Sequence, residues 1–254
     1  MNSPAPYSAL GRQFSAFHKS HFSIVPLAER PIIGCMDVVL IGAGGHGRVV
    51  LDILRAAGVH RPIGFLDADP QLTGQEVGGL PVLGQLNLLS KLKSQKVKGV
   101  IISIGDNHQQ LQHFRKISEQ GFEMVNAIHP ASCVSETARL GRNVVVAAGA
   151  VISTDVNIQD CVIVNTSSVI DHECQIGRAV HICPSATLAG RVSVGDETFI
   201  GLGCNIIQCL KIGANAVVGA GAVVIQDVAD GATVVGVPAR VIKIGKASSE
   251  PVSI

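Results

Sequence analysis

The chain has 254 residues, enough for one large domain or two small ones. Its formal net charge is +1 and it has no long basic run, which disfavours nucleic-acid binding, since phosphates are neutralised by clustered Lys and Arg. No apolar run approaches the roughly 20 residues that span a bilayer. Hydrophobic residues make up 47% of the chain and aromatic residues only 3%, so an aliphatic core in thin, regular layers is expected.

The cysteines favour a reducing compartment. They form no CxxC pair, and several occupy small-residue positions of a repeat described below. We therefore predict reduced core residues in a cytoplasmic protein. The seven are Cys35, Cys133, Cys161, Cys174, Cys183, Cys204 and Cys209.

Residues 1–36 differ in composition from the rest of the chain. They contain scattered Phe and His without a clean period, and they lack the charged start, apolar segment and cleavage site of a signal peptide. We interpret them as an N-terminal extension, and residues 244–254 as a C-terminal tail.

Residues 37–129 alternate between strand and helix patterns. Strands are expected at 38–42, 62–67 and 98–105, helices at 45–58 and 107–121, and a closing segment at 122–129. Gly58 and Gly121 follow the two helices, as C-terminal glycines commonly do. This alternation predicts a Rossmann-like α/β domain with a parallel sheet and crossover helices.

From Val134 onward the sequence follows a strict period of six. Sixteen consecutive positions of this period hold Val, Ile or Leu, ending at Val224. Six is not a helical period, but it suits one short strand plus a turn, stacked so that aliphatic side chains form a column. We therefore predict an all-β repeat domain over residues 130–243.

The segment "GAGGHG" (42–47) lies between the first strand and the first helix. Gly42, Gly44 and Gly47 have the G-x-G-x-x-G spacing, and Asp67 follows twenty residues after the last glycine. Such glycines let backbone amides approach a diphosphate at a helix N-terminus. The alternative is a tight strand–helix turn without a ligand.

Binding of a nicotinamide dinucleotide is disfavoured, because the α/β domain of about 90 residues is too small to contain the two mononucleotide-binding halves that such a cofactor needs. The chain also has no second conventional domain to hold a substrate that accepts the hydride. A smaller nucleotide, such as that of a nucleotide sugar, satisfies the same loop, and His46 could then reach a phosphate or sugar. "IGDN" (104–107) is either a second edge of this cleft or an ordinary N-cap formed by Asp106.

Three ionisable residues, Asp171, His172 and Glu173, follow the inward-facing Ile170 and are therefore expected at a turn. A neighbouring carboxylate favours the imidazolium and fixes the tautomer, which suits a general base. The alternative is a solvated turn. Zinc binding is disfavoured, because three protein ligands are needed and only His181 accompanies His172 in the repeat region.

The repeat resembles the hexapeptide left-handed β-helix, in which three hexapeptides make one coil. The combined motifs resemble nucleotide-sugar N-acetyltransferases, such as the bacillosamine-pathway enzyme, which acetylates a UDP-4-amino-4,6-dideoxy sugar. Relatives include GDP-perosamine N-acetyltransferases and sialic-acid O-acetyltransferases. The resemblance covers residues 37–243 and rests on "GAGGHG", "NAIHP", "NTSSVIDHECQIG", "HICPSATLAGRVSVG" and "GVPAR".

The resemblance implies an acetyl-CoA-dependent homotrimer with active sites at subunit interfaces and without a metal. In it, His172 matches the general base and Glu173 the carboxylate that raises its basicity, while the role of Asp171 is less defined. Acetyl-CoA contacts are implied for His181, Gly190, Leu202 and Ala220. Substrate contacts are implied for Gly44, Gly45, His46 and Asp67. Asn165 either contacts substrate or forms a left-handed turn.

Several questions stay open at this point. Where the family often has a second acid beside the residue matching Asp67, this chain has Ala68, so nucleotide and sugar identity are undecided. A sugar O-acetyltransferase, a GDP-perosamine-type enzyme and a non-catalytic trimeric scaffold are the alternative functions. An oxidoreductase is a more distant one.

Overall fold

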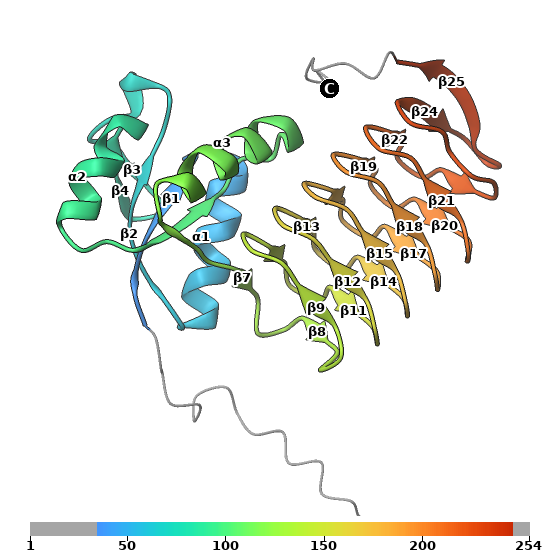
Figure 1. Cartoon of the computed structure of the whole chain (residues 1–254), viewed down its shortest axis with the longest axis horizontal. Helices are drawn as coiled ribbons and strands as arrows, with labels where there is room; N and C mark the ends of the chain where they lie inside the picture. The colour runs from blue at the N-terminus through green and yellow to red at the C-terminus, as the bar shows by residue number, and fades with distance from the viewer. Residues whose placement is uncertain (1–34, 246–254) are drawn as a thin grey trace, which may run out of the picture. The chain divides into compact units, whose positions relative to one another are not determined.

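The computed structural model describes residues 35–245, which fall in one compact unit. Its first part is an α/β domain around a six-stranded sheet of order β3-β4-β2-β1-β5-β6 (Figure 1). The strands are parallel except for the antiparallel pairing of β3 with β4. Their bounds are Asp37–Ile41 (β1), Arg61–Leu66 (β2), Glu76–Val77 (β3), Leu80–Gly84 (β4), Gly99–Ile102 (β5) and Glu123–Met124 (β6). The helices are Gly45–Ala57 (α1), Leu89–Ser94 (α2) and Asn107–Glu119 (α3), with 3-10 turns at Pro70–Leu72 (η2) and Leu86–Leu88 (η3).

The predicted elements of this domain are all present, but three elements were not foreseen. Gly58 ends α1 in the left-handed conformation (φ 63°), as predicted. Between residues 68 and 97 the structure adds β3, β4 and α2. β3 has only two residues and α2 only six, so neither is long enough to display a period, whereas β4, at five residues, is as long as β1 and was missed.

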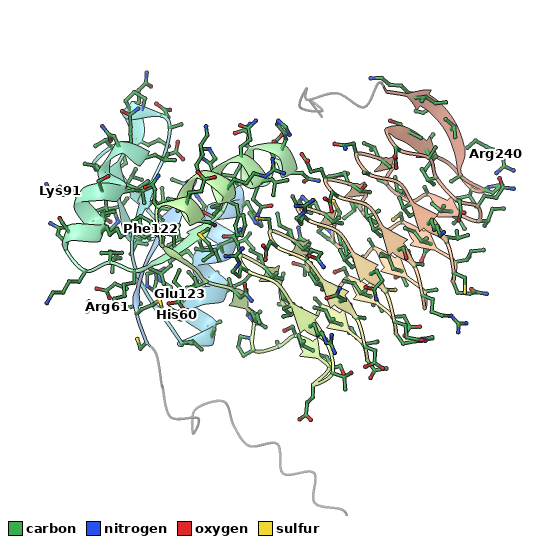
Figure 2. All side chains as sticks on the ribbon, viewed as in Figure 1. His60, Arg61, Lys91, Phe122, Glu123 and Arg240 are labelled. Carbon is green, nitrogen blue, oxygen red and sulfur yellow. The ribbon has the colours of Figure 1, made fainter. Side chains whose placement is uncertain are left out.

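The two edges of the parallel sheet differ in character. At the amino ends of the strands, Asp37 of β1 pairs with Arg61 of β2 (Oδ1 to Nε 2.6 Å), and Figure 2 labels Arg61 there. The carboxyl ends of the same strands lead into the glycine-rich loop and to Asp67. This second edge is where ligands bind in open α/β sheets. No helix within residues 35–245 is long and apolar enough to cross a membrane.

The second part is a β-helix whose short parallel strands stack into three faces, the left-handed β-helix that was predicted (Figure 1). The first face holds Ala127–Ile128 (β7), Val145–Val146 (β10), Ile163–Val164 (β13), His181–Ile182 (β16), Phe199–Ile200 (β19), Val217–Val218 (β22) and Ala232–Val235 (β24), with Arg240–Ile244 (β25) antiparallel at its edge. The second face holds Cys133–Val134 (β8), Val151–Ile152 (β11), Val169–Ile170 (β14), Thr187–Leu188 (β17), Asn205–Ile206 (β20) and Val223–Val224 (β23). The third face holds Arg139–Leu140 (β9), Asn157–Ile158 (β12), Gln175–Ile176 (β15), Ser193–Val194 (β18) and Lys211–Ile212 (β21).

The six-residue period has a direct structural counterpart. Each predicted aliphatic is the second residue of a two-residue strand, and only Val134 and Leu140, in the first coil, are not fully buried. Three residues after each aliphatic from Leu140 to Val218, the backbone turns a corner in the left-handed conformation. The residues with this positive φ are Asn143, Gly149, Asp155, Cys161, Ser167, Glu173, Ala179, Ser185, Arg191, Glu197, Gly203, Cys209, Asn215 and Gly221.

The two parts share contacts along the first face. Val145 and Ile163 pack into the same apolar cluster as residues of β1 and α1. The fully buried Asn143 lies beside the edge of β5, where Nδ2 and Oδ1 meet the carbonyl and amide of Ile102, and the amide-to-Oδ1 distance is 2.7 Å. The first face begins at β7, just before the predicted domain boundary at 129–130. Most of the extension (1–36) and of the tail (244–254) lies outside the described residues.

We expect Ile200→Ala to lower the free energy of unfolding by about 2–5 kcal/mol, because Ile200 is fully buried and truncation leaves a cavity. Ile242→Ala is the matched control, since Ile242 is 65% exposed, and it should change stability by less than about 1 kcal/mol. Guanidinium denaturation at one fixed protein concentration measures both. Equal losses in the two variants would contradict the predicted column of inward aliphatics.

Candidate functional site

The predicted triplet lies at the corner between the second and third faces. His172 Nδ1 is 2.9 Å from Glu173 Oε2, so the ring donates its Nδ1–H to this carboxylate and Nε2 is left to accept a proton. Asp171 instead accepts the backbone N–H of His172 (2.7 Å). The two acids therefore have different tasks: Glu173 contacts the ring, and Asp171 fixes the turn. Both members of the His172–Glu173 pair are about half exposed in the single chain, with side-chain accessibilities of 43% and 51%.

Gly190 lies directly above this pair, one coil further along the chain. A Cβ at Gly190 would stand 2.5 Å from Cε1 of His172, closer than van der Waals contact allows. The backbone N–H of the next residue, Arg191, donates to the carbonyl of His172 (2.8 Å). Glycine is thus required at position 190 for steric reasons, because any side chain would displace the imidazole.

A second cluster forms where the glycine-rich loop meets the first face of the β-helix. The ring centroids of His46 and His181 are 6.4 Å apart. Asn165 Nδ2 lies 3.3 Å from His181 Nε2, while Asn165 Oδ1 accepts the backbone N–H of Thr166. Asn165 is not in the left-handed conformation, which falls instead on Ser167 (φ 56°). The structure therefore brings together loop and β-helix residues that are more than a hundred positions apart.

Burial disfavours the charged form of both histidines in this second cluster. Burial and the nearby His181 lower the pKa of His46 to about 4. Burial also lowers the pKa of His181, an effect that the Gly105 backbone partly opposes. His46 Nε2 and His181 Nδ1 are buried without a hydrogen-bond partner among the described residues. Buried ring nitrogens of this kind are suited to polar groups of a ligand.

The glycine-rich loop is braced from within its own domain. Asp67 Oδ2 accepts the N–H of Ala43 (2.7 Å), and Oδ1 accepts that of Asp69. Gly47 packs against the loop's start, and a Cβ there would lie 3.2 Å from the carbonyl carbon of Gly42. Among the described residues no side chain caps the N-terminus of α1 after Gly44, so its first amides are available to bind an anion. The predicted contacts of Gly44, Gly45 and Asp67 with substrate remain predictions.

The predicted acetyl-CoA residues do not form one cluster within the chain. Gly190 lies against His172, whereas Leu202 and Ala220 occupy successive turns of the corner between the first and second faces. Leu202 is 55% exposed although it is apolar. In a three-sided prism, the corner that carries His172 is opposite the first face, which carries His181. One chain therefore presents the two halves of the predicted site on different sides.

Two further predictions concern groups near the site. Cys174 is fully buried, and burial raises its pKa to about 11, which agrees with the predicted core role. Asp106 caps α3 by accepting the N–H of Gln109 (2.8 Å), so the N-cap interpretation is confirmed. Within the described part of the chain, no group of three or more His, Cys, Asp or Glu side chains has a metal-binding arrangement.

Comparisons with known proteins agree with this geometry. Residues 37–117 match the family described as the PglD N-terminal domain. PerB of Caulobacter crescentus, solved with CoA and GDP-perosamine, shares 43% identity and a TM-score of 0.77, covering 83% of this chain and 98% of its own. The PglB acetyltransferase domain of Neisseria gonorrhoeae FA1090, solved with acetyl coenzyme A, shares 38% identity and a TM-score of 0.78, covering 82% of this chain and all of its own. WeeI of Acinetobacter baumannii AYE shares 26% identity and a TM-score of 0.73, with coverage of 82% and 100%. A search of curated proteins found no match.

An α/β domain joined to a hexapeptide β-helix, in a chain 43% and 38% identical to acetyltransferases solved with CoA and acetyl coenzyme A, identifies an acetyl-CoA-dependent acyltransferase. More specifically, this chain belongs to the nucleotide-sugar N-acetyltransferase family that includes GDP-perosamine N-acetyltransferase. Sequence reasoning found the histidines of both clusters through the family motifs. It missed the steric role of Gly190 and the contacts of Asn143, because both arise between residues that only the folded chain brings together.

We expect Gly190→Ala to reduce kcat by about tenfold or more, because the new methyl group displaces the His172 ring from its position. In a His172→Ala background the same substitution should cost little, since the ring that it would strike is absent. Steady-state kinetics of the two single variants and the double variant form a double-mutant cycle, which measures whether the two residues act together. Additive losses across the cycle would show that Gly190 acts independently of His172.

We expect the free energy of unfolding to fall by on the order of 2 kcal/mol as pH drops from 6.5 to about 4. In this window His46 takes up a proton in the unfolded chain but not in the folded one, because its folded pKa is depressed. The stabilisation is complete above pH 6.5 and is lost as pH falls through the folded pKa. His46→Asn should flatten this part of the stability–pH curve, and an unchanged slope would contradict the prediction.

Proposed function

We propose that this protein transfers the acetyl group of acetyl-CoA to the amine of a nucleotide-linked amino-deoxy sugar. The observation that carries the proposal is the His172–Glu173 pair beside Gly190, in a chain 43% identical to an enzyme solved with CoA and GDP-perosamine. The resemblance of the motifs to the bacillosamine-pathway enzyme points to a UDP-4-amino-4,6-dideoxy sugar, while the relative solved with GDP-perosamine makes a GDP-linked amino sugar the alternative. The nucleotide and the sugar of the substrate determine which glycan the enzyme helps to build.

In this mechanism the substrate amine attacks the thioester carbonyl. A C–N bond forms, the C–S bond breaks, and CoA leaves as a thiolate. His172 Nε2 accepts the amine proton, while Glu173 stabilises the resulting imidazolium through the Nδ1–H hydrogen bond. The proton then passes to the thiolate, which restores neutral His172.

We further propose a homotrimer with each active site at a subunit interface. Within one chain, the corner that carries His172 is opposite the face that carries His181, so a neighbouring copy is needed to complete a site. The outward side of the second face supports this assembly, because several of its residues are apolar and not fully buried. Val151, Val169 and Val223 are partly buried strand residues, and Ile207 and Ile225, which directly follow two of the strands, are 39% and 40% exposed. The outward residues of the third face are polar instead, namely Arg139, Asn157, Gln175, Ser193 and Lys211.

The two ligands have separate surfaces in this proposal. The amides of Gly44 and Gly45 at the start of α1 bind the diphosphate, with Asp67 at the next strand end. His46 and Asn165 face the sugar. Acetyl-CoA lies between two neighbouring copies, with His181, the exposed Leu202 and the turn at Ala220 contributed by one copy and Gly190 by the other. Closing such a site against a second subunit removes water from the half-exposed His172–Glu173 pair.

We expect His172→Ala to lower kcat by about a hundredfold or more while leaving the assembly state unchanged, because the side chain is half exposed and contributes little to folding. Steady-state kinetics and light scattering measure the two quantities. His172→Asn provides a polar control of smaller volume. A near-normal kcat in both variants would remove His172 from the role of base.

The function itself is tested with acetyl-CoA and a panel of UDP-, GDP- and dTDP-linked sugars that carry either a free amine or only hydroxyl groups. Release of the CoA thiol with the amino sugars alone is the expected result. Transfer to the hydroxy sugars alone would identify an O-acetyltransferase. Binding of nucleotide sugars without any thioester cleavage would identify a non-catalytic scaffold.

A further inference from the structure

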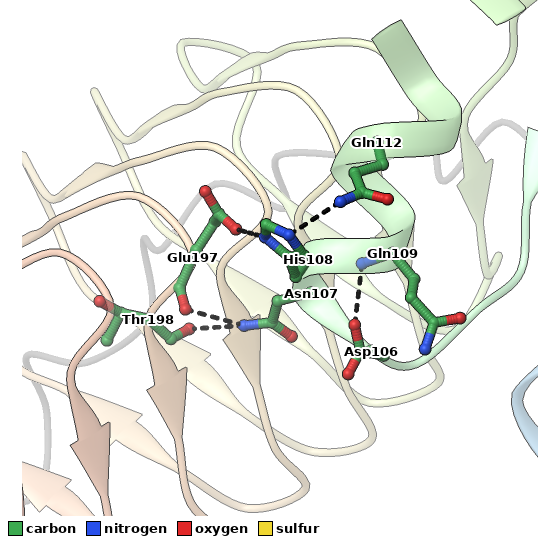
Figure 3. A network of polar contacts seen from close by, with 7 residues as sticks. All are labelled: Asp106, Asn107, His108, Gln109, Gln112, Glu197 and Thr198. Atoms are coloured by element: carbon green, nitrogen blue, oxygen red, sulfur yellow. Dashed lines mark hydrogen bonds and ion pairs between the residues drawn. The ribbon is translucent and has the colours of Figure 1, made fainter. Parts of the chain in front are cut away.

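The first turn of α3 contacts the β-helix at the corner between its third and first faces. Asn107 Nδ2 donates to the carbonyl oxygens of Glu197 and Thr198, each at 3.2 Å, as Figure 3 shows. One side-chain amide thus engages two consecutive carbonyls at a point where the β-helix backbone turns. These two segments are about ninety residues apart in the sequence, so the contact joins the two parts of the fold.

The next residue, His108, makes a second contact with the same corner. Its Nδ1 lies 2.9 Å from Glu197 Oε2, and its Nε2 lies 2.8 Å from Gln112 Nε2 (Figure 3). Because the Gln112 amide nitrogen donates, His108 Nε2 accepts, and the ring carries its proton on Nδ1 toward the carboxylate. Both side chains are largely covered, with accessibilities of 33% for His108 and 19% for Glu197. The pair is therefore better shielded from solvent than an ordinary surface ion pair.

This corner continues directly into the His46–His181 cluster. The carbonyl of Thr198, which accepts from Asn107, also accepts the backbone N–H of His181 (3.0 Å). Phe199 packs edge-on against the His181 ring, with centroids 5.3 Å apart. Thr198 is fully buried, and its hydroxyl donates to the carbonyl of Gly213 (2.6 Å). The segment 197–199 is thus a rigid support for His181.

The segment before α3 provides a second contact between the α/β domain and His181. Gly105, two residues before Asn107, has its backbone near His181, and a Cβ there would lie 3.9 Å from Cβ of His46. His46 itself belongs to the glycine-rich loop. The start of α3 therefore touches both the support beneath His181 and the loop residue that faces it.

We propose that Asn107 and His108 are positioning residues that set the spacing between His46 and His181, and with it the alignment of nucleotide sugar and acetyl-CoA. This inference rests on the proposed function. Neither side chain is required to touch a ligand. Loss of their hydrogen bonds to Glu197 and Thr198 lets the glycine-rich loop and the first face shift relative to each other. A misplacement of about 1 Å between reacting groups can cost on the order of a hundredfold in rate.

Asn107→Asp tests the first contact, because it keeps the shape but replaces the donating amide with a group that repels the two carbonyls. We expect kcat to fall about tenfold, while the separate affinities for CoA and for the nucleotide sugar stay within about threefold of the parent. The matched control is Asn157→Asp, the same substitution on the third face, which removes the hydrogen bond from Asn157 Nδ2 to Gln175 Oε1 (3.2 Å). Equal kcat values for Asn107→Asp and Asn157→Asp would overturn the proposal.

His108 provides an independent test that does not depend on the folding of Asn107→Asp. His108→Ala should lower kcat about tenfold, and His108→Gln should restore most of it, since Gln can still donate to Glu197. A general loss of structure would not be rescued in this way. Failure of the rescue, or an unchanged kcat in His108→Ala, counts against the proposal. An active parent with normal variants refutes this inference alone, whereas an inactive parent on the whole sugar panel refutes the proposed function.

Discussion

The β-helix depends on one backbone constraint, a residue in the left-handed conformation at every sixth position from Asn143 to Gly221. For an L-residue this conformation costs roughly 1–2 kcal/mol. The cost is offset because each corner brings the next strand into register with the coil below and turns its aliphatic side chain inward. The backbone hydrogen bond from Glu173 to the carbonyl of Thr154 (3.0 Å) is one of the contacts that link successive corners. Only five of these corner residues are Asn or Gly, the residue types that adopt the left-handed conformation most readily. Stacking of the coils, and not residue preference, therefore enforces the conformation.

Because the scaffold is held by its inward aliphatics and its backbone, the corners are free to carry different chemistry. The corner between the third and first faces docks the α/β domain through Asn143 and Glu197. The corner between the second and third faces is not covered by the α/β domain in this way, and its His172 and Glu173 side chains are about half exposed to solvent in the single chain. This division places the docking contacts and the proposed base on different edges of the prism, which is consistent with a site completed by a neighbouring subunit.

Much of this architecture could be predicted from sequence because its signals are local. The aliphatic residue at every sixth position and the helix stop at Gly58 both act within a few residues of chain. The prediction failed for β3, β4 and α2, because β3 and α2 are too short to display a period and β4 is fixed by its parallel pairing with β2, which lies earlier in the chain. The Asp171-His172-Glu173 triplet was identified as a candidate base, but adjacency alone left open which acid contacts the ring. The left-handed backbone at Glu173 and the hydrogen bond of Asp171 to the chain resolve that question.

The sequence by itself therefore determined the two-part fold, the glycine-rich loop at a helix start and the identity of the ionisable residues, because periodicity and residue chemistry are local properties. The tertiary structure decided which of those residues meet. Gly190 comes to lie over the His172 ring because one coil of the β-helix returns the chain above its own earlier turn. His46 faces His181, and Asn107 grips the carbonyls beside it, because the α/β domain packs on the first face. These contacts depend on packing between distant segments, which no local pattern encodes.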